Sequence, residues 1–417
     1  MNSLRTSLRA LRYRNYRLFF IGQGISLTGT WMQRMAMGWL VYRLTDSAFL
    51  LGVVGFTNMI PTFILMPIAG VLIDRWNRHR ILVVTQTLAM VQAFVLTGLV
   101  LTGLIEVWHI IALGLLLGVV TAFDGPARQS FVVQMVDQRE DLGNAIALNS
   151  TAFNIARLIG PSVAGALLAL TGEWLCFLLN ALSFLAVIVA LLMMKVPRLT
   201  ASGPSKDVLR SLKEGIAYTY ANAPIRTVLV TLAIVSLTGM QYGTLMPVFA
   251  RDILHGGPQA FGLLMTSTGC GALVGALYLA SRRGTITLGR QIPLAIGLFG
   301  TSLVMFSFSR HLWLSLVLVL ATGFGQIVHT ASSNTVVQTM VDEDKRGRVM
   351  SLYMMAFMGT APFGNLLAGS LASAVGAPST LLLGGGASLL AALYFAWRLP
   401  SLRRAARSVY AGIETAQ

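Results

Sequence analysis

Gly70-Val-Leu-Ile-Asp-Arg-Trp-Asn-Arg-His-Arg80 is a short, strongly basic stretch between two apolar runs, residues 49–73 and 81–105. Neither run contains a charged residue. Each is longer than the about 20 residues that a helix needs to cross a hydrocarbon core of roughly 30 Å. The sequence therefore predicts two transmembrane helices joined by a basic loop, and the rest of the chain repeats this arrangement.

The composition of the 417-residue chain is that of a membrane protein: 55% of its residues are hydrophobic and 11% are charged. Soluble domains carry about a quarter charged residues. A net charge of +16 would suggest nucleic acid as the partner of a soluble protein, but here the basic residues are better explained as loops held on the cytoplasmic side. The two cysteines, Cys176 and Cys270, lie in separate apolar runs and show no metal-ligand spacing. We expect the bilayer as a partner, and no nucleic acid, metal or cofactor.

Twelve transmembrane helices are predicted, because in lipid the backbone must satisfy its own hydrogen bonds. Of the 31 Lys and Arg residues, 26 fall on one side of these spans and only three on the other, which predicts both termini in the cytoplasm. The predicted spans are residues 18–42, 49–73, 81–105, 107–127, 144–171, 174–194, 227–250, 261–281, 291–309, 312–340, 349–376 and 379–397.

A polar insert, residues 195–226, divides the chain into two six-helix halves, 1–194 and 227–417. Apolar residues at 208, 209, 212, 216 and 220 have helical spacing, so the insert is predicted to be a cytoplasmic linker followed by an amphipathic helix on the inner leaflet. The halves repeat: residues 143–172 match residues 347–376 at a constant offset of 204. Such repeats are typical of transporters whose substrate site lies where the halves meet.

The pattern Gly-x-x-x-Asp-Arg-x-x-Arg-x-Arg over 70–80 resembles the loop between helices 2 and 3 of the major facilitator superfamily. The resemblance implies an all-α fold of two pseudo-symmetric halves. It also implies a gating latch, in which the Asp caps the start of helix 11 and the following Arg pairs with an acidic residue at the inner end of helix 4. The latch residues are Gly70, Asp74, Arg75, Arg78, Asp124 and Arg128. The alternative is that the loop is basic only to fix the topology.

Two further runs, 123–130 and 149–161, resemble the subgroup that contains the bacterial enterobactin exporter and the macrolide efflux proteins. Gly160, Pro161 and Gly165 are similar to the helix-5 motif of exporters in this superfamily. By itself, Gly-Pro in a membrane helix indicates a kink or close packing. The resemblance implies export rather than import.

Arg34 and Arg157 fall well inside predicted spans, Arg34 about 25 Å along its helix from Arg17 at 1.5 Å per residue. Such charges are costly and usually face the bundle interior or a wet cavity. We expect a positively charged substrate cavity, with the structural alternative that each Arg bonds a neighbouring helix. His329 also has the simpler reading of an interhelical hydrogen-bonding residue. The candidate cavity residues are Gln23, Thr30, Arg34, Ser150, Asn154, Arg157, Gln241, Gln326 and His329.

The function expected from this sequence is export of an amphipathic small molecule, such as a siderophore, macrolide or other drug, from a bacterial inner membrane. Protons are the expected coupling ion and a monomer the expected state. The candidate proton carriers are Asp124, His329, Glu106 and Glu173. No acidic residue lies clearly in the middle of a predicted span. The alternatives are an importer or facilitator on the same fold and, remotely, a membrane enzyme. We expect no catalytic residues, since the five histidines are scattered over both membrane faces.

Overall fold

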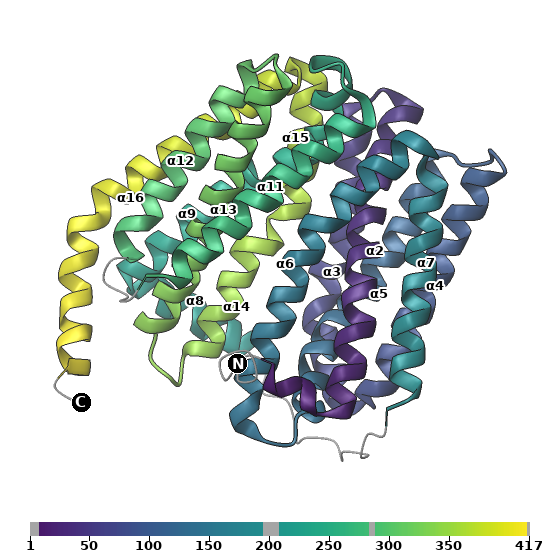
Figure 1. The fold of residues 1–417 in the computed structure, drawn as a ribbon. Coiled ribbons are helices and arrows are strands. Elements are labelled where there is room, and N and C mark those ends of the chain that lie inside the picture. The colour runs from purple at the N-terminus through teal and green to yellow at the C-terminus, as the bar shows by residue number, and fades with distance from the viewer. Residues whose placement is uncertain (1–7, 195–207, 283–287, 415–417) are drawn as a thin grey trace. The chain divides into compact units, whose positions relative to one another are not determined.

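The computed structural model describes residues 8–194, 208–282 and 288–414 and contains helices but no strand within them (Figure 1). The first part contains a short 3-10 helix and six long helices: η1 Arg9–Arg12, α2 Arg14–Thr45, α3 Ala48–Arg75, α4 Arg78–Leu101, α5 Val107–Met135, α6 Arg139–Leu170 and α7 Glu173–Leu192. The second part contains α8 Val208–Ala221, α9 Ala223–Thr238, η2 Met240–Leu245, α10 Met246–Val248, η3 Phe249–Ile253, α11 Gly257–Ala280, α12 Leu288–Phe308, α13 Leu312–Met340, α14 Arg346–Met354, η4 Met355–Gly359, α15 Ala361–Val375 and α16 Ala377–Glu414.

The chain divides into two compact units. Unit 1 comprises Met1–Leu50, Thr57–Ser205 and Gly256–Thr266, and unit 2 comprises Leu51–Phe56, Lys206–His255 and Ser267–Gln417. The change from one unit to the other at 205–206 falls inside the polar insert that separates the predicted halves. Short segments of α3 and α11 nevertheless belong to the other unit, which sequence patterning gave no reason to expect.

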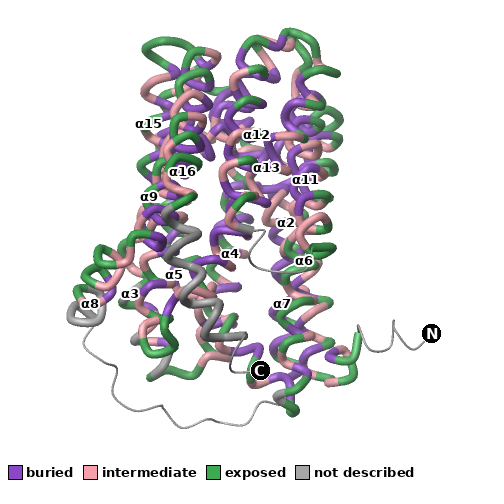
Figure 2. Tube along the Cα trace, turned by 90° about the vertical axis from the view of Figure 1, so that its left-hand side faces the viewer, coloured by how far each residue is buried: buried purple, intermediate pink, exposed green. Residues whose placement is uncertain are grey.

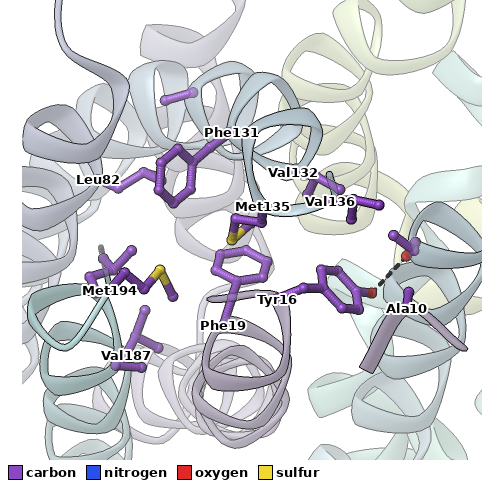
Figure 3. Close-up of a cluster of buried hydrophobic side chains, with 14 of the residues drawn as sticks. Ala10, Tyr16, Phe19, Leu82, Phe131, Val132, Met135, Val136, Val187 and Met194 are labelled. Atoms are coloured by element: carbon purple, nitrogen blue, oxygen red, sulfur yellow. Dashed lines mark hydrogen bonds between the residues drawn. The ribbon is translucent and has the colours of Figure 1, made fainter. Parts of the chain in front are cut away.

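Unit 1 packs α2 beside α6 and α7, and α4 beside α5 and α7. Its largest apolar cluster lies at one end of these helices, where Phe19, Phe131 and Met135 are almost fully buried (Figure 3). Tyr16 is also fully buried there, and its hydroxyl donates a 2.8 Å hydrogen bond to the Ala145 carbonyl on α6. A buried hydroxyl without such an acceptor would be strongly destabilising. This bond therefore fixes the start of α2 against α6.

Unit 2 packs α12 between α13 and α16, and α9 against α16. The rings of Phe249 and Phe306 stack at 4.6 Å between centroids, and both side chains are fully buried. These contacts show that unit 2, like unit 1, has an apolar core of its own.

The internal repeat is visible in the backbone. Gly172, between α6 and α7, and Gly376, between α15 and α16, lie 204 residues apart and both have φ of 86°. That region of φ is readily accessible only to glycine. Helices α5 and α13 both contain 29 residues and begin 205 positions apart. The two halves therefore share the length of this helix pair and the backbone conformation of this helix junction.

Ten helices of the described chain are long and apolar enough to cross a membrane, against twelve predicted. The other two predicted spans correspond to α2 and to α14–η4–α15. Helix α2 is long but carries Gln23, Gln33 and Arg34 in its length, which lowers its hydropathy. The second is interrupted by a π-helical turn at Met355–Gly359, so neither flanking piece reaches a full span alone.

Many residues along the long helices are exposed, as the green stretches in Figure 2 show, and many large apolar side chains are among them. Examples are Leu170, Leu294 and Trp313, which are 80%, 72% and 78% exposed. Soluble proteins do not expose apolar surface on this scale. These side chains suit contact with lipid chains.

Helix α8 covers the segment predicted to be amphipathic, and Figure 2 shows it as a separate short helix. Its Glu214 carboxylate lies 2.7 Å from the Arg348 guanidinium on α14, while Ile216 and Tyr220 are exposed. The side chains of residues 208–212 lie outside the described part. Contact of α8 with the inner leaflet remains a prediction.

Candidate functional site

The two arginines predicted to lie inside membrane spans, Arg34 and Arg157, gather around one indole ring. The Arg34 guanidinium carbon lies 5.1 Å from the centroid of the Trp31 ring, and that of Arg157 lies 5.9 Å from it. Phe153 meets the same ring edge-on at 5.7 Å between centroids. Because Trp31 and Arg34 are on α2 and Phe153 and Arg157 on α6, two helices build the group. We call Trp31, Arg34, Phe153 and Arg157 the basic–aromatic cluster.

Gly160 allows α6 to approach Trp31. A Cβ added at position 160 would lie 2.6 Å from the Trp31 Cβ and 3.0 Å from the Thr28 carbonyl oxygen. Contacts under 3.0 Å force a neighbour to move, and both of these atoms are close to or part of the α2 backbone. Since Arg157 lies one helical turn before Gly160, the glycine places the Arg157 side chain over the indole.

The remaining residues of the predicted exporter motif also lie at a close helix approach. Pro161 is buried within α6. A Cβ at Gly165 would lie 2.7 Å from the Gly262 Cα on the part of α11 that belongs to unit 1. One turn away, the hydroxyls of Ser162 and Thr266 are 2.7 Å apart. The motif therefore serves close packing in the C-terminal half of α6.

Neither guanidinium of the basic–aromatic cluster forms a hydrogen bond or an ion pair with any residue in the described ranges. Arg34 is exposed and Arg157 is half-buried, so their N–H groups can still be reached. The three buried carboxylates described in unit 1 are each paired elsewhere: Asp124 with Arg128, Glu173 with Arg43 and Asp141 with Arg9 and Arg12. The cluster therefore carries two uncompensated positive charges.

The other predicted cavity residues of unit 1 are Gln23, Thr30, Ser150 and Asn154. Gln23 is buried, and the Thr30 hydroxyl donates 2.9 Å to the Ser26 carbonyl of its own helix. On α6, the Asn154 amide donates 2.8 Å to the carbonyl of Ser150, whose side chain is exposed. These residues lie on the helices that carry the cluster, and their contact with substrate remains a prediction.

The predicted cavity residues of unit 2 each bond a different partner. Gln241 donates 3.2 Å to the Ser236 carbonyl, whereas Gln326 on α13 accepts a 3.3 Å hydrogen bond from the Tyr242 hydroxyl. His329 is almost fully buried and its Nδ1 lies 3.3 Å from the Ser333 hydroxyl. Its Nε2 has no hydrogen-bond partner among the residues that the structure describes.

Asp124, a carboxylate of the predicted latch, is bonded by three side chains. It accepts hydrogen bonds from Thr85 at 3.0 Å and Gln86 at 2.7 Å, both on α4, and forms an ion pair with Arg128 one turn along α5. Helix α5 continues to Met135, so Arg128 lies within a helix rather than just beyond its span. In the described structure Asp124 thus joins α4 to α5, and its predicted pairing with the basic loop is not among its contacts.

The remaining latch residues lie at the junction of α3 and α4. Gly70 has open space around it, Arg75 is exposed and Arg78 is half-buried. Asn77 caps α4 by accepting a 3.1 Å hydrogen bond from the Arg80 amide. The side chain of Asp74 lies outside the described part of the chain, so its helix-capping role remains a prediction.

The internal repeat relates Asp124 to His329. With an offset of 205, Asp124 on α5 corresponds to His329 on α13, and Arg128 corresponds to Ser333. Both are i,i+4 pairs of contacting side chains, and both titratable groups are at least nine-tenths buried. Helices α5 and α13 therefore each hold a buried titratable group, Asp124 and His329, at matching positions.

Sequence reasoning missed Trp31 and the pair Thr85 and Gln86. Trp31 precedes Arg34 by three residues, a spacing that places both on one side of a helix and could have drawn attention to it. Nothing in the sequence pairs α4 with Asp124, because that contact depends on how α4 and α5 pack.

The long apolar helices define a multi-pass membrane protein. The chain matches the family described as "Transmembrane secretion effector" over residues 5–411, and therefore belongs to this family of the major facilitator superfamily. It is 28% identical to the staphyloferrin A transporter of Staphylococcus aureus over 90% of this chain and 94% of that protein. It is 26% identical to the multidrug efflux pump Tap of Mycolicibacterium fortuitum, covering 87% and 88%. It is 23% identical to macrolide efflux protein A of Streptococcus pyogenes, covering 90% and 94%.

Solved structures support the same fold. A bacterial homologue of the iron transporter ferroportin in an inward-facing state aligns with a TM-score of 0.68, covering 93% of this chain and 98% of that one at 19% identity. A POT family transporter in complex with a thioalcohol-conjugated peptide aligns with a TM-score of 0.73, covering 93% and 96% at 11% identity. At these identities the likeness establishes the architecture alone. The family match confirms the predicted superfamily, and the structural likeness confirms the all-α fold.

Proposed function

We propose that this protein exports an amphipathic small molecule across the cytoplasmic membrane of a bacterium by alternating access. The observation that carries the proposal is the match over almost the full length of three transporters, two of which are named as efflux proteins. Their names span a siderophore, several drugs and a macrolide, so the substrate class is an amphipathic organic molecule. We assign no enzymatic activity, because the family consists of transporters.

We further infer that protons drive export. Coupling needs a buried group whose protonation alternates between conformations, usually an intramembrane Asp, Glu or His. Asp124 and His329 fit this role by burial and by their matching positions in the two halves. Glu173 and Glu106 fit it less well. Glu173 binds Arg43 through both carboxylate oxygens at 2.7 and 3.1 Å, and Glu106 caps α5 and accepts from the Trp108 indole.

The distribution of Lys and Arg favours an orientation with both termini in the cytoplasm. The protein is proposed to act as a monomer. The residues proposed to meet substrate on the α2–α6 side are Gln23, Thr30, Arg34, Ser150, Asn154 and Arg157. Gln241, Gln326 and His329 are proposed to line the pathway in unit 2.

Accumulation of labelled substrates in cells tests the proposal. Cells with and without the protein would be loaded with a panel that includes a catecholate siderophore and a macrolide, before and after a protonophore collapses the proton gradient. The proposal predicts lower accumulation of at least one compound, and loss of that difference with the gradient. Higher accumulation in cells that carry the protein would instead establish import.

A further inference from the structure

We propose that the basic–aromatic cluster of Trp31, Arg34, Phe153 and Arg157 is an anion-binding site that selects amphipathic molecules carrying a carboxylate. The proposal rests on the proposed export function only for the statement that the bound molecule is the one transported. Binding of the anion itself follows from the contacts of the cluster.

The first step concerns unmet hydrogen-bond donors. A guanidinium offers five N–H donors in a planar fork, and neither Arg34 nor Arg157 gives one to an acceptor in the described part of the chain. Both lie on helices within unit 1 at a depth where charge is costly. Water or a bound anion must therefore satisfy these donors. A carboxylate does so best, since its two oxygens match the guanidinium fork.

The second step concerns charge. The two guanidinium carbons lie 5.1 and 5.9 Å from one indole centroid, so two positive charges adjoin a single ring. The buried carboxylates described in unit 1 are committed to Arg9, Arg12, Arg43 and Arg128. None of them neutralises the cluster. A bound organic anion would offset these two positive charges, whereas a cationic molecule would add to them.

The third step concerns the rest of the ligand. Phe153 is 44% exposed and packs edge-on against Trp31, so an aromatic surface adjoins the two guanidiniums. An apolar or conjugated group can stack there while its carboxylate reaches the arginines. The cluster therefore specifies both parts of the ligand: a carboxylate and a flat apolar body.

A matched pair of dyes tests this inference directly. Fluorescein carries a free carboxylate that its methyl ester lacks, and the two otherwise share one ring system. Binding of each would be measured by fluorescence anisotropy on the purified full-length protein in nanodiscs of zwitterionic phosphatidylcholine. We expect the acid to bind roughly tenfold more tightly than the ester, as charge-assisted bidentate recognition predicts.

Variants assign the selectivity to the cluster. Arg34→Gln and Arg157→Gln should each reduce the acid-to-ester affinity ratio, and the double variant should bring it close to one, while Arg157→Lys should keep part of it. Unchanged ester affinity shows that a variant is folded. Arg282→Gln is the matched control, because Arg282 also lies over an aromatic ring, 4.9 Å from the Tyr278 centroid, but outside the cluster.

Three results would overturn the inference: equal affinity for acid and ester in the unmodified protein, a ratio that survives in the double variant, or no binding of the acid up to about 1 mM. Its failure is distinguishable from failure of the proposed function. Export of dyes in cells with no acid preference would refute the anion site alone. A cluster-dependent acid preference without any export in cells would refute the proposed function alone.

Discussion

Gly160 on α6 faces Trp31 on α2 so closely that a Cβ at position 160 would lie 2.6 Å from the Trp31 Cβ. This relationship joins the glycine of the predicted exporter motif to the aromatic ring around which Arg34 and Arg157 gather. The motif and the charged cluster, which the sequence presented as separate features, form one structure.

Gly160→Ala should therefore separate α2 from α6 and disturb the cluster. Overpacking of this kind costs about 1–3 kcal/mol, and we expect a loss of that size in the free energy of unfolding together with reduced export. Thermal unfolding in detergent and cell accumulation would measure the two effects. The control is Gly98→Ala on α4, where an added Cβ meets nothing within 4 Å. Equal behaviour of the two variants would contradict the assigned role of Gly160.

Arg157→Ala should abolish export while the protein still reaches the membrane. The change removes one of the two uncompensated charges without removing any described hydrogen bond, so little stability should be lost. Arg157→Lys should retain part of the activity, because Lys keeps the charge but lacks the planar fork. Membrane abundance by immunoblot would accompany the accumulation assay. Normal export by Arg157→Ala would exclude this residue from the substrate site.

Asp74→Asn should slow conformational cycling without changing which compounds are exported. The superfamily resemblance gives Asp74 a helix-capping role. Asn caps a helix as well as Asp but carries no charge, so the variant loses only the charge–dipole interaction, about 0.3–1 kcal/mol, equivalent to roughly a two- to fivefold lower rate. Initial efflux rates over the whole substrate panel would provide the comparison. A changed substrate spectrum would show that Asp74 acts in recognition rather than in gating.

Asp124→Asn should uncouple transport from the proton gradient. An amide still accepts from Thr85 and Gln86 but cannot change its charge, so downhill movement should persist while uphill export is lost. Efflux from preloaded cells and gradient-driven export would be measured separately. Glu173→Gln serves as the matched comparison, because Glu173, like Asp124, is a buried carboxylate paired with an arginine. Uphill export by Asp124→Asn at the unmodified rate would remove Asp124 as a proton carrier.

Asp141→Asn should loosen the N-terminal segment. The Asp141 carboxylate lies 2.9 Å from Arg9 and 2.8 Å from Arg12 and accepts a 2.9 Å hydrogen bond from the Tyr13 hydroxyl, which together fasten η1 to the start of α6. Limited trypsin digestion should cut after Arg9 and Arg12 several-fold faster in the variant, an effect typical of local opening. An unchanged cleavage rate would mean that other contacts hold this end, such as the Tyr16 hydrogen bond and the 3.0 Å hydrogen bond from the Ala10 amide to the Asn144 side chain.

Most of the fold could be predicted from the sequence, because membrane helices are specified by long apolar runs and by the sides on which Lys and Arg lie. The internal repeat could also be predicted from the sequence, and Gly172 and Gly376 have the same φ, as the repeat predicts. The π-helical turn at 355–359 was not predicted, although Pro362 follows it and cannot donate a backbone hydrogen bond to the carbonyl of residue 358.

The candidate site could be predicted only in part. Arg34 and Arg157 stood out because charge is rare inside a span. The Trp31 ring between them, and the contacts of Thr85 and Gln86 with Asp124, depend on which helices pack together. A single sequence carries no record of those pairings.

The central claim is proton-driven export, and the most direct measurement uses the purified protein in sealed liposomes. The compound would be a labelled one that cells were found to export. Its concentration would be measured on the side of the liposome membrane to which the protein moves it, with and without an imposed pH gradient. The account predicts accumulation against the compound's own concentration gradient, only when the pH gradient is present, and its loss in Asp124→Asn. Equilibration that ignores the pH gradient would contradict it and identify the protein as a facilitator.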